Sequence, residues 1–252
     1  MGREGSRTHE MLPHPGPTPA EGEVESIIGG RSGALRAAIF GANDGLVSNL
    51  SLIMGVAGAG VDPHVIVLAG VAGLLAGAFS MGAGEYVSMR VQRELFERLI
   101  HIEAHELAED PEGETRELAG LLERRGIPRP LAGETATALM ADPKIALDVH
   151  VKEELGLDPQ ELGSPWGAAS SSFVAFSIGA FIPLVAFLFG SGVAATLTAV
   201  PLSLIALFTL GAFMARYTGR TARYSGIRML LIGGGAALVT YGVGRILGVA
   251  VS

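Results

Sequence analysis

Five long apolar segments constrain the fold of this chain more than any other feature. They lie at roughly residues 35–60, 64–89, 166–190, 193–215 and 227–250, and each has the length that a helix needs to cross a bilayer. The composition agrees, since 49% of the 252 residues are hydrophobic. The sequence therefore predicts an all-α membrane protein with five transmembrane helices.

The connections between these segments predict how the chain is oriented. Tight turns at 60–63 and 190–192 carry no Lys or Arg, whereas four arginines crowd the loop between the last two segments: Arg216, Arg220, Arg223 and Arg228. Because basic loops stay in the cytoplasm, we expect a cytoplasmic N-terminus and an extracytoplasmic C-terminus. Residues 1–30 are rich in Pro, Gly and charge, without the apolar core of a secretory signal, and we expect a disordered tail.

Residues 91–164 form a separate acidic region between the second and third spans. They carry 17 Asp and Glu against 8 Lys and Arg, so a nucleic-acid partner is not expected. Helix-forming residues continue from the second span to about residue 109, where Pro111 and Gly113 should break the helix. Further helices are predicted at 114–125, 131–141 and 143–155. We expect a cytoplasmic helical domain, flanked by membrane segments 31–90 and 165–252, that needs bound ions or a partner surface for stability.

Three Glu-x-x-Glu pairs lie in this acidic region. A spacing of three places both carboxylates of a pair on one helix face, and the pairs are Glu94/Glu97, Glu103/Glu106 and Glu114/Glu117. Such a concentration of oxygen ligands suits a divalent cation, although a solvated acidic face is the simpler alternative. The chain contains no cysteine, which excludes thiolate metal sites and disulfides.

Asp44 lies within the first span, about 15 Å deep if the preceding ten residues are helical. An acid there costs about 2.5–3.5 kcal/mol on insertion scales. We interpret it as part of an ion or proton pathway, with a structural hydrogen bond to another helix as the alternative.

The end of the second span brings sulfur and carboxylate onto one helix face, through Met81, Glu85 and Met89. A methionine stripe is commonly core packing, and Glu85 could be a solvated acid at the helix end. Thioether together with carboxylate nevertheless favours a borderline ion such as Fe²⁺. His101 and His105 are spaced for one helix turn but match no metalloprotease or di-iron motif, and exposed histidines are the simpler interpretation.

With the spans, the Glu pairs and the motifs DGLVSNLSLIMG, GAFSMGAGEYVS and HVKEELGLDP, residues 32–250 resemble the vacuolar iron transporter family of Fe²⁺ and Mn²⁺ carriers. The resemblance implies a dimer of five-helix subunits, with a cytoplasmic three-helix metal-binding domain extending from the second span. It also implies divalent-metal/proton antiport out of the cytosol. Glycine pairs at spacing four, such as Gly41/Gly45 and Gly244/Gly248, suggest close helix contact that could serve such a dimer.

Carried over by position, the resemblance puts Asp44 and Met81 on the ion path. It implies metal binding by the cytoplasmic glutamates Glu103, Glu106, Glu114, Glu117 and Glu154. Two departures follow from the same comparison. Gly73 stands where members with a well-defined pathway have a second-span acid, for which Glu85 is a candidate replacement. His150 and Val151 stand where the family has paired methionines, and the imidazole of His150 suits Fe²⁺, Mn²⁺ or Zn²⁺.

We therefore expect a proton-coupled exporter of Fe²⁺, Mn²⁺ or both, in the plasma membrane of a bacterial-type cell. The alternative from another class is a membrane-anchored metal sensor or buffer without transport. An intramembrane enzyme is not expected, because no nucleophile–base pair is identifiable, and no prosthetic group is implied. The preference between iron and manganese stays open.

Overall fold

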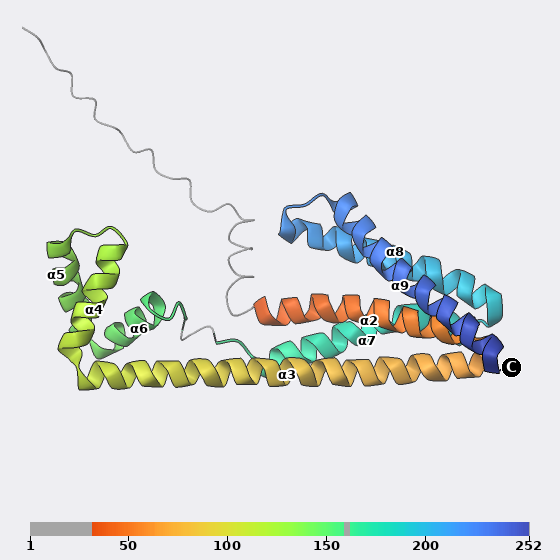
Figure 1. Ribbon diagram of the computed structural model, residues 1–252, viewed down its shortest axis with the longest axis horizontal. Helices are drawn as coiled ribbons and strands as arrows, with labels where there is room; N and C mark the ends of the chain where they lie inside the picture. Colours follow the sequence, from red (N-terminus) through yellow and green to blue (C-terminus); the bar gives the residue numbers. More distant parts are fainter. Residues whose placement is uncertain (1–31, 159–161, 252) are drawn as a thin grey trace, which may run out of the picture.

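The computed structural model describes residues 32–158 and 162–251, in which every regular element is a helix (Figure 1). The predicted N-terminal tail lies outside these residues. The eight described helices are α2 (Ser32–Gly58), α3 (Pro63–Glu109), α4 (Pro111–Arg124), α5 (Arg129–Met140), α6 (Pro143–Glu153), α7 (Pro165–Phe189), α8 (Gly192–Thr218) and α9 (Ala222–Val251).

Five of these helices are long and apolar enough to cross a membrane, namely α2, α3, α7, α8 and α9. This confirms the predicted number of spans, and most of the observed ends fall within three residues of the predicted ones. The largest difference is the start of α9, which begins at Ala222 rather than at residue 227. The additional turn contains Arg223, and a helix that emerges from the bilayer can carry a charged first turn at little cost.

Helix α2 packs against α7 and α9 through glycines. A Cβ at Gly41 would come within 2.6 Å of the carbonyl oxygen of Ser172 on α7. Gly244 of α9 approaches the backbone of α2 at Gly55 in the same way, and Gly248 approaches Ala59 just after α2. Without side chains at these positions the helices approach backbone to backbone. The predicted glycine contacts are therefore present, but between helices of one chain, so a dimer would need another surface.

Helix α3 is a single helix that extends well beyond the bundle, as predicted (Figure 1). Its 47 residues correspond to about 70 Å, more than twice the roughly 30 Å of a hydrocarbon core. The helix ends at Asp110, whose carboxylate accepts a hydrogen bond from the backbone N–H of Gly113 at 2.9 Å and caps α4. Pro111 occupies the first turn of α4, where a missing N–H costs nothing.

The prediction that Gly113 breaks the helical path was therefore wrong, because α4 begins three residues earlier than expected and Gly113 lies within its first turn. The chain turns at Asp110 alone.

Helices α4 to α6 form a small domain at the far end of α3, beyond the bundle (Figure 1). Its apolar core consists of Leu118 and Leu122 from α4 against Ala132 and Ala136 from α5. Helix α6 lies against α3, with Ala146, His150 and Val151 buried. The core is small, so polar contacts between α3, α4 and α6 matter for how these helices are held.

Candidate metal centre and membrane cavity

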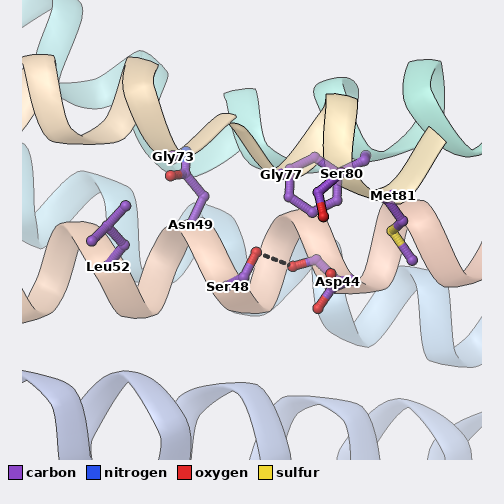
Figure 2. A pocket seen from close by; sticks show the side chains of 9 residues that line it. Asp44, Ser48, Asn49, Leu52, Gly73, Gly77, Ser80 and Met81 are labelled. Atoms are coloured by element: carbon purple, nitrogen blue, oxygen red, sulfur yellow. Dashed lines mark hydrogen bonds between the residues drawn. The ribbon is translucent and has the colours of Figure 1, made fainter. Parts of the chain in front are cut away.

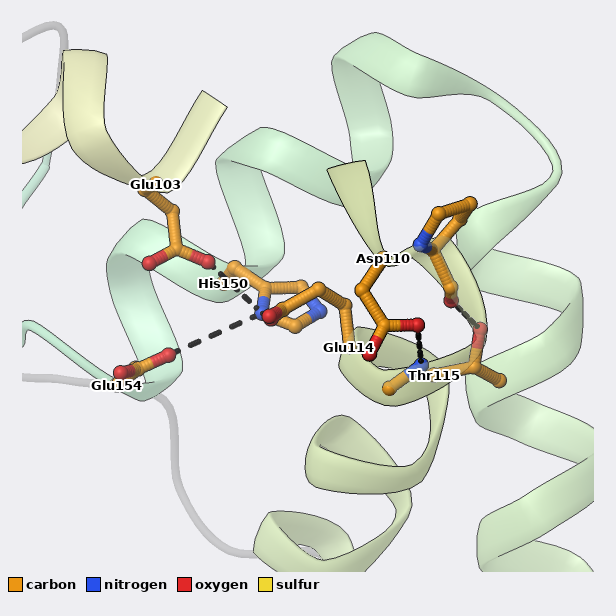
Figure 3. Close-up of polar contacts among 8 residues, drawn as sticks. Glu103, Asp110, Glu114, Thr115, His150 and Glu154 are labelled. Carbon is orange, nitrogen blue, oxygen red and sulfur yellow. Dashed lines mark hydrogen bonds and ion pairs between the residues drawn. The ribbon is translucent and has the colours of Figure 1, made fainter. Parts of the chain in front are cut away.

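Four potential metal ligands from three helices converge where α6 meets the end of α3 (Figure 3). They are Glu103 of α3, Glu114 of α4, His150 of α6 and Glu154 at the C-terminal cap of α6. Each offers one ligand atom, and these four atoms lie within 4.8 Å of one another. We call this group the metal-ligand cluster.

The ring nitrogen Nδ1 of His150 lies at the centre of the cluster. It is 3.0 Å from a carboxylate oxygen of Glu103, 3.5 Å from one of Glu114 and 3.9 Å from one of Glu154. His150 is fully buried and Glu103 is 3% exposed. Deep burial of an acid and an imidazole side by side is uncommon unless their polar atoms have partners.

The potential ligand atoms of the cluster lie close to one another, but three of them form no hydrogen bond. Oε1 of Glu103 and both ring nitrogens of His150 are buried and lack a hydrogen-bond partner of acceptable geometry. Four ligands at about 2.1 Å from a tetrahedral ion would be separated by about 3.4 Å, within the range of the three distances to Nδ1. The arrangement therefore fits a divalent cation, and mixed imidazole and carboxylate ligands suit Fe²⁺, Mn²⁺ or Zn²⁺.

Burial and mutual repulsion disfavour the charged forms of this cluster. Burial, and then the charges of Glu154 and Glu114, raise the pKa of Glu103 to about 7. The pKa values of Glu114 and Glu154 are also raised, first by burial and then by neighbouring carboxylates. Burial lowers the pKa of His150. A bound cation would reverse the penalty on the carboxylates, because it stabilises their ionised forms.

Two local features of the sequence bring the cluster together. The turn at Asp110 directs α4 away from the axis of α3 and places Glu114, four residues later, near Glu103 on the last turns of α3 (Figure 3). At the other side, Asp142 caps α6 by accepting a hydrogen bond from the backbone N–H of Lys144 at 2.8 Å. Helix α6 then carries His150 and Glu154 on one face, because they are four residues apart.

The remaining candidates of the acidic region lie outside the cluster. Glu106 and Glu117 are exposed, but they lie near enough for their charges to contribute to the raised pKa values of Glu103 and Glu154. Glu94 and Glu97 pair with Arg90 and Arg93 on the surface of α3 at 2.7 and 2.8 Å. His101 and His105 are exposed, and His105 lies 3.2 Å from Glu109.

A second candidate site lies at the membrane-spanning helices, where Asp44 of α2 and Met81 of α3 line an open cavity of ≈ 250 Å³ (Figure 2). We call it the membrane cavity. The structure thus brings together the two residues that the sequence placed on the ion path. The other residues that line it are Ser48, Asn49, Leu52, Gly73, Gly77, Ser80 and Phe176.

Ser48, Asn49 and Ser80 were missed by the sequence reasoning. Each is a polar residue within an apolar span, which is a usable signal, but helical periodicity alone did not show which of the many serines faces the cavity. Ser48 is held by a hydrogen bond from its hydroxyl to the carbonyl oxygen of Asp44 at 2.5 Å.

The other members of the predicted sulfur–carboxylate face lie away from the cavity. Glu85 is half-buried and is not among the residues that line it. Met89 is 6% exposed and packs with Ala37 and Ala168, which is the core-packing alternative. Gly73 does line the cavity, and a Cβ there would meet a methyl group of Leu52 and come 2.9 Å from Oδ1 of Asn49.

Five helices of membrane-spanning length define a membrane protein, and a group of potential metal ligands lies on an extension of one of them. Comparison with known proteins is more specific, because the model of the VIT family matches residues 35–245. The chain belongs to that family, as the sequence motifs predicted.

Several relatives are similar over most of their length. A vacuolar iron transporter of Acanthamoeba castellanii is 35% identical over 232 residues, covering 89% of this chain and 82% of that protein. Vacuolar iron transporter 1 of Arabidopsis thaliana is 29% identical over 213 residues, covering 84% and 85%. A vacuolar iron transporter of Toxoplasma gondii is 31% identical over 227 residues, covering 84% and 74%.

Proposed function

We propose that this protein transports divalent iron, and also Mn²⁺, out of the cytosol in exchange for protons. Membership of the VIT family and the names of the relatives, which are iron transporters, support metal transport. Proton coupling and Mn²⁺ go beyond these names and rest on the chemistry of the site residues.

The observation that carries the proposal is the membrane cavity. An acid, a thioether and two hydroxyls line a space among membrane-spanning helices. These groups can replace part of the hydration shell of a divalent cation. A protein that used its spans only as an anchor would gain nothing from an acid in a cavity at these spans.

In this proposal, residues 91–164 are the cytoplasmic metal-binding domain and supply the cavity with ions. The metal-ligand cluster collects Fe²⁺, Mn²⁺ or Zn²⁺ from the cytosol, and the exposed Glu106 and Glu117 attract cations towards it. Asp44 has to be ionised to bind a cation and takes up a proton after the ion leaves. That alternation couples metal movement to proton movement in the opposite direction.

A homodimer is part of the proposal, for a reason independent of the glycine pairs. Asp44, Ser48 and Ser80 are all exposed on the spans of the single chain. In a monomer these side chains would face lipid, at a cost of about 2.5–3.5 kcal/mol for the acid alone. A second copy that covers this surface would remove that cost.

For orientation and location, we propose a cytoplasmic N-terminus, an extracytoplasmic C-terminus and the plasma membrane of a bacterial-type cell. The arginines at the end of α8, in the turn that follows and at the start of α9 support the orientation. The relatives named above are eukaryotic and carry the word vacuolar in their names, so they lend no support to that membrane.

Flux through purified protein in sealed lipid vesicles tests the proposal. Vesicles loaded with a metal-quenched dye and a pH-sensitive dye should report entry of Fe²⁺ or Mn²⁺ together with proton movement in the opposite direction. As a control, a proton gradient imposed without external metal should not quench the metal-sensitive dye. Metal entry without any proton movement would reject the coupling, and no entry at all would reject transport.

The alternative is a membrane-anchored metal sensor or buffer. One observation favours it: the metal-ligand cluster lies on an extension beyond the bundle, as a separate binding domain would. It predicts metal binding by the purified protein with no flux in the same vesicles.

A further inference from the structure

Asn49 is the most deeply buried polar residue of the membrane cavity. Its side chain is 2% exposed, and its amide nitrogen Nδ2 donates a hydrogen bond to the carbonyl oxygen of Ala180 on α7 at 2.6 Å. Its amide oxygen Oδ1 is buried and accepts no hydrogen bond. Native proteins rarely leave a buried carbonyl oxygen without a donor, because desolvation is then uncompensated.

The hydrogen bond to Ala180 fixes which way the amide points. If nitrogen and oxygen were exchanged, two carbonyl oxygens would face each other at 2.6 Å, so the oxygen must lie on the other side. That side faces Gly73 of α3, a residue that lines the membrane cavity together with Asn49 (Figure 2). Glycine at position 73 makes room for this oxygen, because a Cβ there would come too close to Oδ1, at 2.9 Å.

The position of Asn49 extends the sequence of ligands along α2. Asp44 and Asn49 are five residues apart, which corresponds to about 7.5 Å along the helix axis. An amide oxygen is a hard, neutral ligand of the kind that divalent cations accept alongside carboxylates. Unlike a carboxylate it exchanges no proton near neutral pH. It can therefore hold a cation weakly and release it without protonation.

We propose that Oδ1 of Asn49 coordinates the transported divalent cation at a second position in the membrane cavity, beyond Asp44. The inference rests on the proposed transport function and adds a ligand to its path. It assigns the unpaired oxygen a partner, and it explains why the cavity continues past Asp44 to the contact between Asn49 and Gly73.

Flux of Fe²⁺ and Mn²⁺ into vesicles containing the full chain tests this inference with two variants. Asn49→Leu keeps the volume and removes the oxygen, while Asn49→Asp keeps an oxygen and adds charge. Both lose the donor to Ala180, so both should melt at a lower temperature than the unsubstituted protein. Ser172→Ala is the matched control, because Ser172 is fully buried with an unpaired hydroxyl but does not line the cavity.

If Asn49 is a ligand of the transported ion, the two variants should differ in their KM for metal. We expect Asn49→Leu to raise KM by about tenfold, which corresponds to about 1.4 kcal/mol. Asn49→Asp should lower KM, with a lower maximal rate because the ion leaves more slowly. The Ser172→Ala control should keep the KM of the unsubstituted protein.

If Asn49 has only a structural role, the expected result is different. Both Asn49 variants would then lose thermal stability while their KM stayed unchanged, and that result would overturn the inference. If Asn49→Leu cannot be recovered folded, Asn49→Asp decides alone: a lowered KM supports the ligand role and an unchanged KM overturns it. Absence of flux in the unsubstituted protein would instead overturn the proposed function, and the inference with it.

Discussion

At the scale of single residues, Asp44 carries the strongest expectation. It is the single acidic residue in α2 and lines the membrane cavity. We expect Asp44→Asn to reduce metal flux by at least about tenfold while the protein still folds and inserts, since the amide keeps the shape but cannot exchange a proton. Flux in vesicles and the elution profile in detergent are the measurements.

Asp148→Asn is the matched control for that variant. It makes the same chemical change on α6, where Asp148 pairs with Lys152 at 2.9 Å far from the cavity. Flux at the unsubstituted rate in Asp44→Asn would remove Asp44 from the path.

Met81 should affect which metal is carried. Its thioether is a soft ligand beside the hard carboxylate of Asp44, so Met81→Ala should slow Fe²⁺ flux more than Mn²⁺ flux. We expect a weaker effect than that of Asp44→Asn, of about three- to tenfold for Fe²⁺. The ratio of initial rates for the two metals is the measurement, and each metal serves as the control for the other. An equal loss for both metals would show that the sulfur does not select.

At the scale of helices, the metal-ligand cluster makes the stability of the protein depend on pH. Without metal, the raised pKa values of Glu103, Glu114 and Glu154 mean that the folded state binds protons more readily than the unfolded chain. The contribution of Glu103 is fully present below about 4.5, its ordinary pKa, and is lost as the pH rises through about 7. Those of Glu114 and Glu154 change in the same direction. The lowered pKa of His150 acts in the opposite sense, destabilising the fold as the pH falls below 6.5.

Three carboxylates outweigh one imidazole, so we expect the metal-free protein to melt at a lower temperature at pH 8 than at pH 5. Saturating Mn²⁺ should reverse that order, since the cation competes with protons for the same oxygens. Thermal melts at pH 5 and pH 8, recorded in chelator and in Mn²⁺, measure both effects. The glutamine of Glu103→Gln is neutral at every pH tested, so this variant should reduce the pH dependence of the melting temperature of the metal-free protein. An unchanged slope in that variant would mean that the raised pKa of Glu103 is not its source.

An isolated fragment of residues 90–163 should gain helicity and thermal stability on adding Fe²⁺, Mn²⁺ or Zn²⁺. Its apolar core is small, and metal binding would then supply part of its folding free energy. Replacing Glu103, Glu106, Glu114 and Glu117 by Gln should abolish the gain, as circular dichroism and calorimetry would report.

The chain offers a matched control for the fragment experiment. Glu94→Gln with Glu97→Gln removes a Glu pair on the same helix that is already paired with arginines. This double variant should keep the metal response. A fragment that shows no heat of binding at millimolar metal would leave the acidic region as a solvated surface.

The helices themselves could be predicted because hydrophobicity, prolines and glycines are local signals. The end of α3 near residue 109 was predicted, but the break assigned to Gly113 was wrong, because a glycine is tolerated in a first turn that an aspartate caps. Which acids converge could not be predicted from spacing alone. Glu103 is buried and Glu106 exposed although both belong to one pair, and only the approach of α6 decides between them. The orientation of Asn49 likewise depends on α7, which is far away in sequence.

At the scale of the whole molecule, the surface around Asp44 should lie between two copies of the chain. Because the chain contains no cysteine, a single Ser48→Cys substitution places one thiol on that surface. We expect it to cross-link two subunits in membranes on mild oxidation. Leu238→Cys, on α9 and 72% exposed, should cross-link much less. A monomeric mass in nanodiscs at every concentration would reject the dimer.

The length of α3 also sets how far apart the two candidate sites lie. Glu103 and Met81 are separated by 22 residues of one helix, about 33 Å. That gap is too wide for an ion to pass directly from one ligand to the next. An ion released from the cluster therefore diffuses freely before it reaches the cavity, because α3 links the two sites and not the ion to either of them. The rigid helix thus keeps ion capture and ion passage at two separate places, so that a substitution in the cluster can change metal binding there without changing the cavity.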